Sequence, residues 1–114
     1  MTRPNLENYV IRAQKSLKVQ RQRSAFFSDN FIFDNPPWEM LLEIFIATEQ
    51  ESCISLEKLT ERLTAPKSII FRWVDIFADR RYLVWCEQHK QPCLRLTDGA
   101  REQCGAYLDA IAII

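Results

Sequence analysis

The stretch that decides the fold is residues 55–81, SLEKLTERLTAPKSIIFRWVDIFADRR. Ser55 is a helix-capping residue, and leucines follow it at helical spacing until Thr64-Ala65-Pro66 interrupts the pattern. Pro66 opens a second helix, whose inward apolar stripe consists of Ile70, Trp73, Val74 and Phe77. Two helices joined by a tight turn form a helix-turn-helix, whose second helix can lie in a major groove of DNA.

After Arg81 the pattern changes to that of strands, and residues 82–87 and 92–97 flank a four-residue tip, Gln88-His89-Lys90-Gln91. This tip predicts a hairpin in which Glu87 opposes Pro92, Cys86 opposes Cys93, Trp85 opposes Leu94, Val84 opposes Arg95 and Leu83 opposes Leu96. One face of the hairpin is then apolar, with Leu83, Trp85, Leu94 and Leu96. A slip of one residue would turn these side chains to solvent, so the clean apolar face favours this register.

Helices are predicted on both sides of this unit. Residues 5–23 have an apolar stripe of Leu6, Tyr9, Val10, Ala13 and Leu17. Arg12, Lys15 and Lys18 lie on the other side, which is either a solvated face or a ridge facing phosphate. Asn35 is a natural N-cap and Pro36 a natural first residue for a largely buried helix that runs to about residue 50.

The last predicted helix starts at Thr97 and Asp98. Its apolar stripe consists of Ala100, Cys104, Tyr107, Leu108 and Ile111, and the sequence ends in Ile113-Ile114. Such a helix packs either on its own domain or on a partner.

Aromatic residues crowd around the breaker at residues 34–37: Phe26, Phe27, Phe31, Phe33 and Trp38. Such a cluster is too dense to be left in water, and it predicts a core that links two helices. The functional alternative is a small-molecule pocket with aromatic walls.

These patterns predict a mainly α protein with a small β-hairpin wing, that is, a winged helix-turn-helix. The expected division is an N-terminal amphipathic helix and aromatic linker over 1–34, the winged helix-turn-helix over 35–97 and a C-terminal helix over 98–114. The chain has 114 residues, 47% of them apolar, which fits one packed domain. The helices at the two ends are expected to form a homodimer.

Charge excludes a general binder of polyanions, because 15 basic residues balance 15 acidic ones. The charge is uneven: residues 1–27 carry six basic groups and one acid, whereas residues 28–64 carry two and eight. Any contact with nucleic acid must therefore be local, and the acidic middle cannot face phosphate. No apolar run approaches the roughly 20 residues of a membrane span, and the first residues are polar, so we expect a cytoplasmic protein with no membrane contact.

The cysteines and the single histidine do not form a known site pattern. Cys53, Cys86, Cys93 and Cys104 show no CxxC spacing, and with His89 alone a zinc-finger type of site is not available. Reduced thiols are the default expectation. Two alternatives remain: a strained disulfide between Cys86 and Cys93 that acts as a redox switch, and a metal site of Cys86, His89 and Cys93, which lacks a fourth ligand.

An enzyme is the weakest functional class for this sequence. The chain has two glycines and therefore no Gly-rich phosphate loop, and its one histidine falls on a predicted loop tip. Glu39 and Glu43, four residues apart on one helix, are expected to be solvated charges rather than a general acid and base. We expect no catalytic residues, no cofactor and no metal.

Three patches resemble the MarR family of winged-helix regulators. Residues 21–42, with Arg21-x-Arg23-x-x-Phe26-Phe27 and Phe33-Asp34-Asn35-Pro36-Pro37-Trp38, are similar to a subgroup of short winged-helix proteins of alphaproteobacterial type. Residues 65–74 resemble that subgroup's recognition helix, and Leu94-Arg95-Leu96-Thr97 resembles the strand that closes a MarR wing. The resemblance implies a dimeric DNA-binding transcription factor, with an effector that the sequence does not identify.

The sequence also departs from the family. The family's wing implies an arginine at its tip that reaches a minor groove, and here only Lys90 matches that role. Gly99 falls one position early relative to the family's Leu-Thr-x-x-Gly, and the sequence lacks the second C-terminal helix that longer members use for dimerisation.

The leading prediction is a sequence-specific transcriptional regulator of double-stranded DNA. Lys67, Ser68, Phe71 and Arg72 would face base edges or phosphates, and Arg80, Arg81 and Lys90 would hold the DNA backbone. Phe71 has a second interpretation, as an ordinary exposed or packing aromatic. The competing function is a winged-helix module that binds a protein, favoured by the zero net charge, by Asp75 and Asp79 on the same helix, and by Ile69 and Phe71 near its exposed side.

Overall fold

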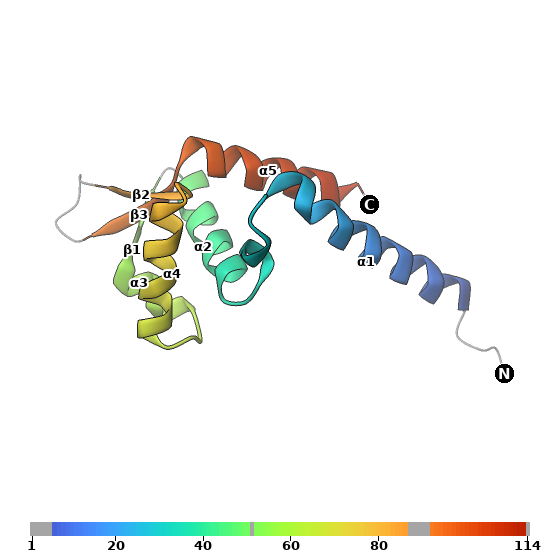
Figure 1. Cartoon of the computed structure of the whole chain (residues 1–114), viewed down its shortest axis with the longest axis horizontal. Helices are drawn as coiled ribbons and strands as arrows, with labels where there is room; N and C mark the ends of the chain where they lie inside the picture. The colour runs from blue at the N-terminus through green and yellow to red at the C-terminus, as the bar shows by residue number, and fades with distance from the viewer. Residues whose placement is uncertain (1–5, 51, 87–91, 114) are drawn as a thin grey trace.

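The computed structural model describes residues 6–50, 52–86 and 92–113. The elements in chain order are α1 (Leu6–Phe26), the 3-10 turn η1 (Asn30–Phe33), α2 (Pro37–Glu49), β1 (Ile54–Ser55), α3 (Leu56–Arg62), α4 (Lys67–Asp79), β2 (Leu83–Cys86), β3 (Cys93–Leu96) and α5 (Asp98–Ala112). Helices α2 to α4 and the sheet form a body, α5 runs back from the sheet, and α1 reaches beyond it (Figure 1). The predicted fold class, mainly helical with a hairpin wing, is confirmed.

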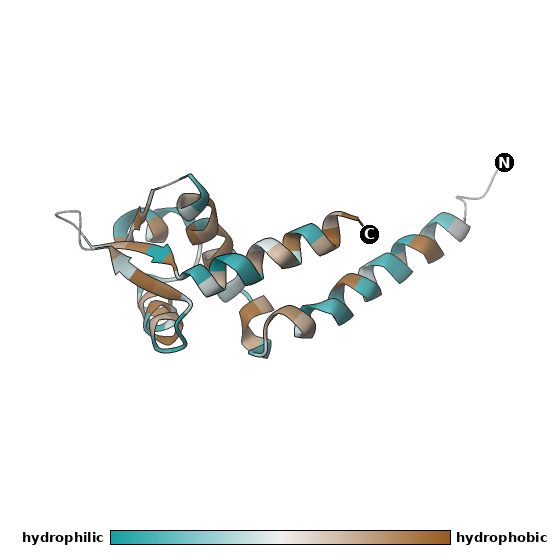
Figure 2. Cartoon of the chain, turned by 90° about the horizontal axis from the view of Figure 1, so that it is seen from above, coloured by the Kyte–Doolittle hydropathy of each residue, from teal (hydrophilic) through white to brown (hydrophobic). Residues whose placement is uncertain are grey.

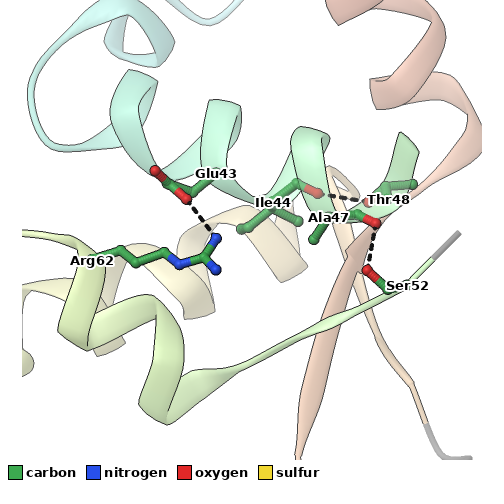
Figure 3. A network of polar contacts seen from close by, with 6 residues as sticks. All are labelled: Glu43, Ile44, Ala47, Thr48, Ser52 and Arg62. Atoms are coloured by element: carbon green, nitrogen blue, oxygen red, sulfur yellow. Dashed lines mark hydrogen bonds and ion pairs between the residues drawn. The ribbon is translucent and has the colours of Figure 1, made fainter. Parts of the chain in front are cut away.

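The helix-turn-helix is formed by α3 and α4. The Ser55 hydroxyl accepts a hydrogen bond from the backbone N–H of Lys58 at 3.1 Å and caps α3, as predicted. An ion pair of 3.1 Å between Arg62 and Glu43 joins the other end of α3 to α2 (Figure 3). Ile70, Val74 and Phe77 are buried, as predicted. The half-buried Trp73 packs on Phe31, with ring centroids 5.3 Å apart.

The sheet has three antiparallel strands in the order β1-β3-β2. The predicted register is confirmed for its described pairs, Leu83 with Leu96, Val84 with Arg95, Trp85 with Leu94 and Cys86 with Cys93. The predicted pair of Glu87 and Pro92 lies outside the described residues. Strand β1 was not predicted, because two residues are too short to show alternation; it pairs Ile54 with Leu94 and Ser55 with Cys93.

One residue of the predicted apolar face of the hairpin is exposed rather than buried. Leu83, Leu94 and Leu96 are buried, but the Trp85 side chain is 44% exposed. Trp85 lies on the edge strand β2 and has a strand partner on one side only, Leu94, whereas Leu94 on the central strand is flanked by both Trp85 and Ile54. The alternation predicted the correct side of the sheet but not which strand would lie at its edge.

The start of α2 also differs from the prediction. Pro36, rather than Asn35, occupies the N-cap position, and no side chain caps the helix. The backbone carbonyl of Asp34 accepts the hydrogen bond from the Trp38 N–H at 2.9 Å. This N–H is the donor that an Asn35 cap would have satisfied, so the cap is not needed.

The aromatic cluster is part of the core, as predicted. Phe27 is 1% exposed, and its ring makes edge-to-face contacts with Phe33, Trp38 and Tyr82. The remaining members, Phe26 and Phe31, are half-buried against the same core. The cluster therefore joins the end of α1 to α2 and to the strand that follows α4.

A buried threonine fixes the sheet to α2. The Thr48 hydroxyl donates to the Ile44 carbonyl at 2.8 Å (Figure 3) and accepts from the backbone N–H of Leu96 at 3.0 Å. Ser52 donates to the Ala47 carbonyl at 2.9 Å in the same region (Figure 3). These bonds satisfy a polar group that would otherwise be costly to bury.

Helix α1 makes the chain elongated. The radius of gyration is 17.0 Å, against about 13 Å for a compact domain of this size. The helix has 21 residues, about 31 Å at 1.5 Å per residue, and its first half extends away from the rest of the chain (Figure 2). None of the described helices is both long enough and apolar enough to cross a membrane.

Candidate nucleic-acid interface

Helix α4 presents one continuous exposed face. Of the seven residues predicted to contact DNA, Lys67, Ser68, Phe71 and Arg72 are all exposed on it. At 3.6 residues per turn, Ser68 and Arg72 point away from the buried stripe of Ile70, Val74 and Phe77, whereas Lys67 and Phe71 lie at its edge. The structure places these four side chains on the exposed surface of the first half of α4.

The charge of this face changes sign along the helix. Lys67 and Arg72 lie in its N-terminal half, and the exposed Asp75 and Asp79 lie in its C-terminal half. Recognition helices of helix-turn-helix proteins contact base edges with their N-terminal residues. The cationic half is therefore the half that such a docking would bring closest to DNA, and Asp75 lies one turn further on the same side as Phe71 and Arg72.

Phe71 combines the two interpretations offered by the sequence. Its side chain is 43% exposed, and it borders a surface pocket of about 340 Å³ beside the start of α3. The pocket is lined by Ser55, Leu56, Glu57, Thr60, Lys67, Phe71 and Pro92. One part of the ring is thus in contact with its own domain, while the rest is available to an apolar group such as a thymine methyl.

Arg80, predicted to hold the DNA backbone, already has partners within the chain. Its Nη1 lies 3.3 Å from Oδ1 of Asp29, and its guanidinium lies 5.9 Å from the centre of the Phe31 ring. The Tyr82 hydroxyl donates to Oδ2 of the same Asp29 at 2.6 Å. Burial, and next the Asp29 hydrogen bond, raise the pKa of Tyr82 above its ordinary value.

Asp29 is therefore an organising residue that the sequence did not reveal. It precedes η1 and lies 51 residues before Arg80 in the chain, so no local spacing connects the two. The contacts of Asp29 attach the segment between α1 and α2 to the residues that follow the end of α4.

Arg81 is exposed and has an unusual backbone conformation. Its φ is +61°, in the left-handed region that glycine and asparagine tolerate best. Its carbonyl accepts a hydrogen bond from the Thr97 hydroxyl at 2.8 Å, so the turn is attached to the start of α5. An arginine at such a position costs stability. Lys90, the last predicted contact, lies outside the described residues, as does His89.

A second exposed surface lies on α1. The half-buried residues near its end, Val19, Gln22, Arg23 and Phe26, share the side that faces the body. Tyr9, Val10 and Leu17 belong to the predicted apolar stripe, fall on a different side and are 54%, 54% and 46% exposed. The stripe is therefore not covered by the described part of its own chain.

No metal centre is found among the described residues. Within residues 6–50, 52–86 and 92–113, no group of three or more His, Cys, Asp or Glu side chains is placed to hold a metal ion.

Comparison by sequence finds no matching protein-family model and no matching curated protein. A structure from Archaeoglobus fulgidus matches with a TM-score of 0.62 at 16% identity, over 73% of this chain and 91% of that one. The wild-type MarR of E. coli matches with a TM-score of 0.59 at 15% identity, over 97% of this chain and 78% of that one. The multiple antibiotic-resistance repressor MarR of Listeria monocytogenes matches with a TM-score of 0.53 at 17% identity, over 99% of this chain and 78% of that one. The chain has a MarR-like winged-helix fold.

Proposed function

We propose that this chain is a sequence-specific, double-stranded DNA-binding transcriptional regulator that acts as a homodimer. The observation that carries the proposal is the exposed face of α4, which is cationic at its N-terminal half. The likeness to a repressor of the same fold supports it. In this arrangement α4 enters the major groove, and the wing of residues 82–97 lies along the DNA backbone.

Each side chain of the interface has a chemical role. The Arg72 guanidinium reads a guanine by two hydrogen bonds, Ser68 makes a tolerant polar contact and Phe71 touches a thymine methyl. Lys67 neutralises phosphate near the start of the helix. Arg80, Arg81 and Lys90 hold the backbone, and for Arg80 a phosphate replaces or shares the carboxylate of Asp29.

The proposed dimer uses the elements at the two ends of the chain. The apolar stripe of α1 is exposed on a helix that extends beyond the body, and Ile113 at the end of α5 is 89% exposed. Pairing these surfaces between two copies would cover them and place two recognition helices about one DNA turn apart. Residues 1–34 and 98–114 would then mediate pairing, and residues 35–97 would read DNA.

Arg72→Ala is expected to flatten base preference at one or two base pairs of each half-site. A bidentate arginine–guanine contact contributes about 1–3 kcal/mol of discrimination, and alanine removes it.

Lys90→Ala is expected to weaken binding to all DNA sequences alike. It should also lower the slope of log affinity against log salt concentration by about one unit per subunit. Both variants are measured against a randomised operator library at two salt concentrations, with circular dichroism to verify folding.

The competing function is a winged-helix module that binds a protein instead of DNA. Asp75 and Asp79, exposed on α4, favour it because carboxylates repel phosphate. If neither Arg72→Ala nor Lys90→Ala changes affinity or preference, α4 does not read DNA and this function replaces the proposal. The protein-binding function is also favoured if the chain binds random-sequence duplex DNA weakly and its affinity does not fall steeply with salt concentration.

Arg81→Gly is expected to raise stability while it weakens DNA binding. Glycine relieves the cost of a positive φ, about 1 kcal/mol, and the lost guanidinium removes one phosphate contact. Arg81→Asn is the matched variant, since asparagine is also neutral and tolerates this conformation. Urea denaturation and salt-dependent binding are measured for both. Equal DNA affinity in wild type and both variants would show that Arg81 does not contact DNA.

A further inference from the structure

Three of the four cysteines gather on one side of the wing. Cys86 on β2 and Cys93 on β3 are direct cross-strand partners, on the face opposite Leu83 and Leu96. Cys53 lies just before β1, two residues before Ser55, which pairs with Cys93, so it belongs to the same side of the sheet. Cys104 is alone in α5 and fully buried. All four thiols are free.

Cross-strand partners have a spacing that a disulfide accepts. Directly opposed residues of an antiparallel pair have Cα atoms about 4.5 or 5.5 Å apart, and both values fall inside the range of about 4.4–6.8 Å found for disulfides. The Cβ atoms of such pairs are about 4.5–5.5 Å apart, slightly wider than a relaxed disulfide prefers. A bond between Cys86 and Cys93 therefore forms with little backbone movement but with strain, which makes it easily reduced.

The other two cysteines are poorly suited to reaction. Burial, and next the neighbouring thiols of Cys86 and Cys93, raise the pKa of Cys53 to about 12. Burial likewise raises the pKa of Cys104 to about 12. Because the thiolate is the reactive form, the raised pKa slows the reaction of Cys53 and Cys104 near neutral pH. Cys86 is half-buried and accessible, and Cys93 is buried beside it.

We propose that Cys86 and Cys93 form an oxidation site for hydroperoxides, which closes a reversible disulfide between the two strands of the wing. The Cys86 sulfur, having lost its proton, attacks the O–O bond of hydrogen peroxide and becomes a sulfenic acid, with release of water. The Cys93 sulfur then attacks the sulfenic sulfur, and a second water leaves as the S–S bond forms. Two thiols lose two electrons and two protons, and one peroxide becomes two waters.

The position of this bond gives it a consequence for binding. It would join β2 to β3 at the end of the ladder next to residues 87–91. The two wing strands would then be held together covalently at that end. The effect on DNA affinity rests on the proposed function, but formation of the bond does not. Chemistry and DNA binding are therefore measured separately.

The test uses the full chain treated with hydrogen peroxide, whose intact mass is measured first and whose thiols are then alkylated after unfolding in urea. Wild type is expected to lose about 2 Da in intact mass, to retain two alkylatable thiols and to recover four after dithiothreitol. Peptide mapping should place the bond between Cys86 and Cys93. Cys53→Ser and Cys104→Ser should form it unchanged, whereas Cys86→Ser and Cys93→Ser should not.

Several outcomes would overturn the proposal. Four free thiols after peroxide, a bond that includes Cys53, or a bond that needs two chains would each do so. Cys86→Ala serves as a second variant if Cys86→Ser fails to fold by circular dichroism. A wild-type bond that forms while DNA binding is absent would preserve the oxidation site and reject the proposed function, so the two failures are distinguishable.

Discussion

Val10→Asp is expected to convert the protein to a monomer and to lower its affinity for a two-half-site operator by at least about 100-fold. The Val10 side chain is 54% exposed in the centre of the apolar stripe of α1, so aspartate leaves the fold intact but places a charge in the proposed interface. Joining two reading modules raises affinity by about 100- to 10,000-fold, and this gain is lost with the dimer. Sedimentation at micromolar concentration measures the mass.

The matched control for this variant is Ile11→Asp. Ile11 lies one residue further along, is 47% exposed and points to a different side of α1. Wild type and Ile11→Asp are expected to sediment as dimers of twice 13.5 kDa, and Val10→Asp as a single chain. A wild-type monomer that binds DNA with full specificity would reject the dimer. Equal loss in both variants would show that the stripe is not the interface.

Phe27→Ala is expected to destabilise the protein by about 3–5 kcal/mol. The Phe27 ring is 1% exposed and contacts Phe33, Trp38 and Tyr82, which come from three different segments. Alanine leaves a cavity and removes three edge-to-face contacts. A change of this size is a large fraction of the stability of a domain.

Phe71→Ala is the control for the core variant. It deletes the same atoms from a side chain that is 43% exposed, and should change the free energy of unfolding by less than about 1 kcal/mol. Urea denaturation followed by far-ultraviolet circular dichroism measures both. A loss below about 1.5 kcal/mol for Phe27→Ala would contradict the central role assigned to this ring.

The helices and the wing register were predictable because their signals are local and periodic. Ser55 and Thr97 both cap helices as predicted, with bonds to the N–H groups of Lys58 and Ala100. Cys86 and Cys93 oppose each other as predicted, because the four-residue tip and the apolar alternation together favour this register. Arg72 is exposed because it points away from the buried stripe of α4.

What the sequence did not predict depends on contacts between distant segments. Asp29 binds Arg80 and Tyr82 although no pattern connects residues so far apart. Trp85 lies on the predicted side of its strand but is exposed because β2 is an edge strand, and strand order cannot be read from local periodicity. The positive φ of Arg81 was also not predicted, since arginine gives no signal for that conformation.

The contacts of Asp29 have a consequence for the spacing of DNA half-sites. They attach the segment that follows α1 to the end of α4, so we expect α1 and α4 to move together as one rigid unit. In a dimer joined through α1, the distance between the two reading helices would then be fixed by how the α1 helices are aligned. Sliding that alignment by one helical turn, about 5.4 Å, corresponds to between one and two base pairs of about 3.4 Å each. Relatives with the same recognition helix but a differently aligned α1 would prefer operators with a different spacer length.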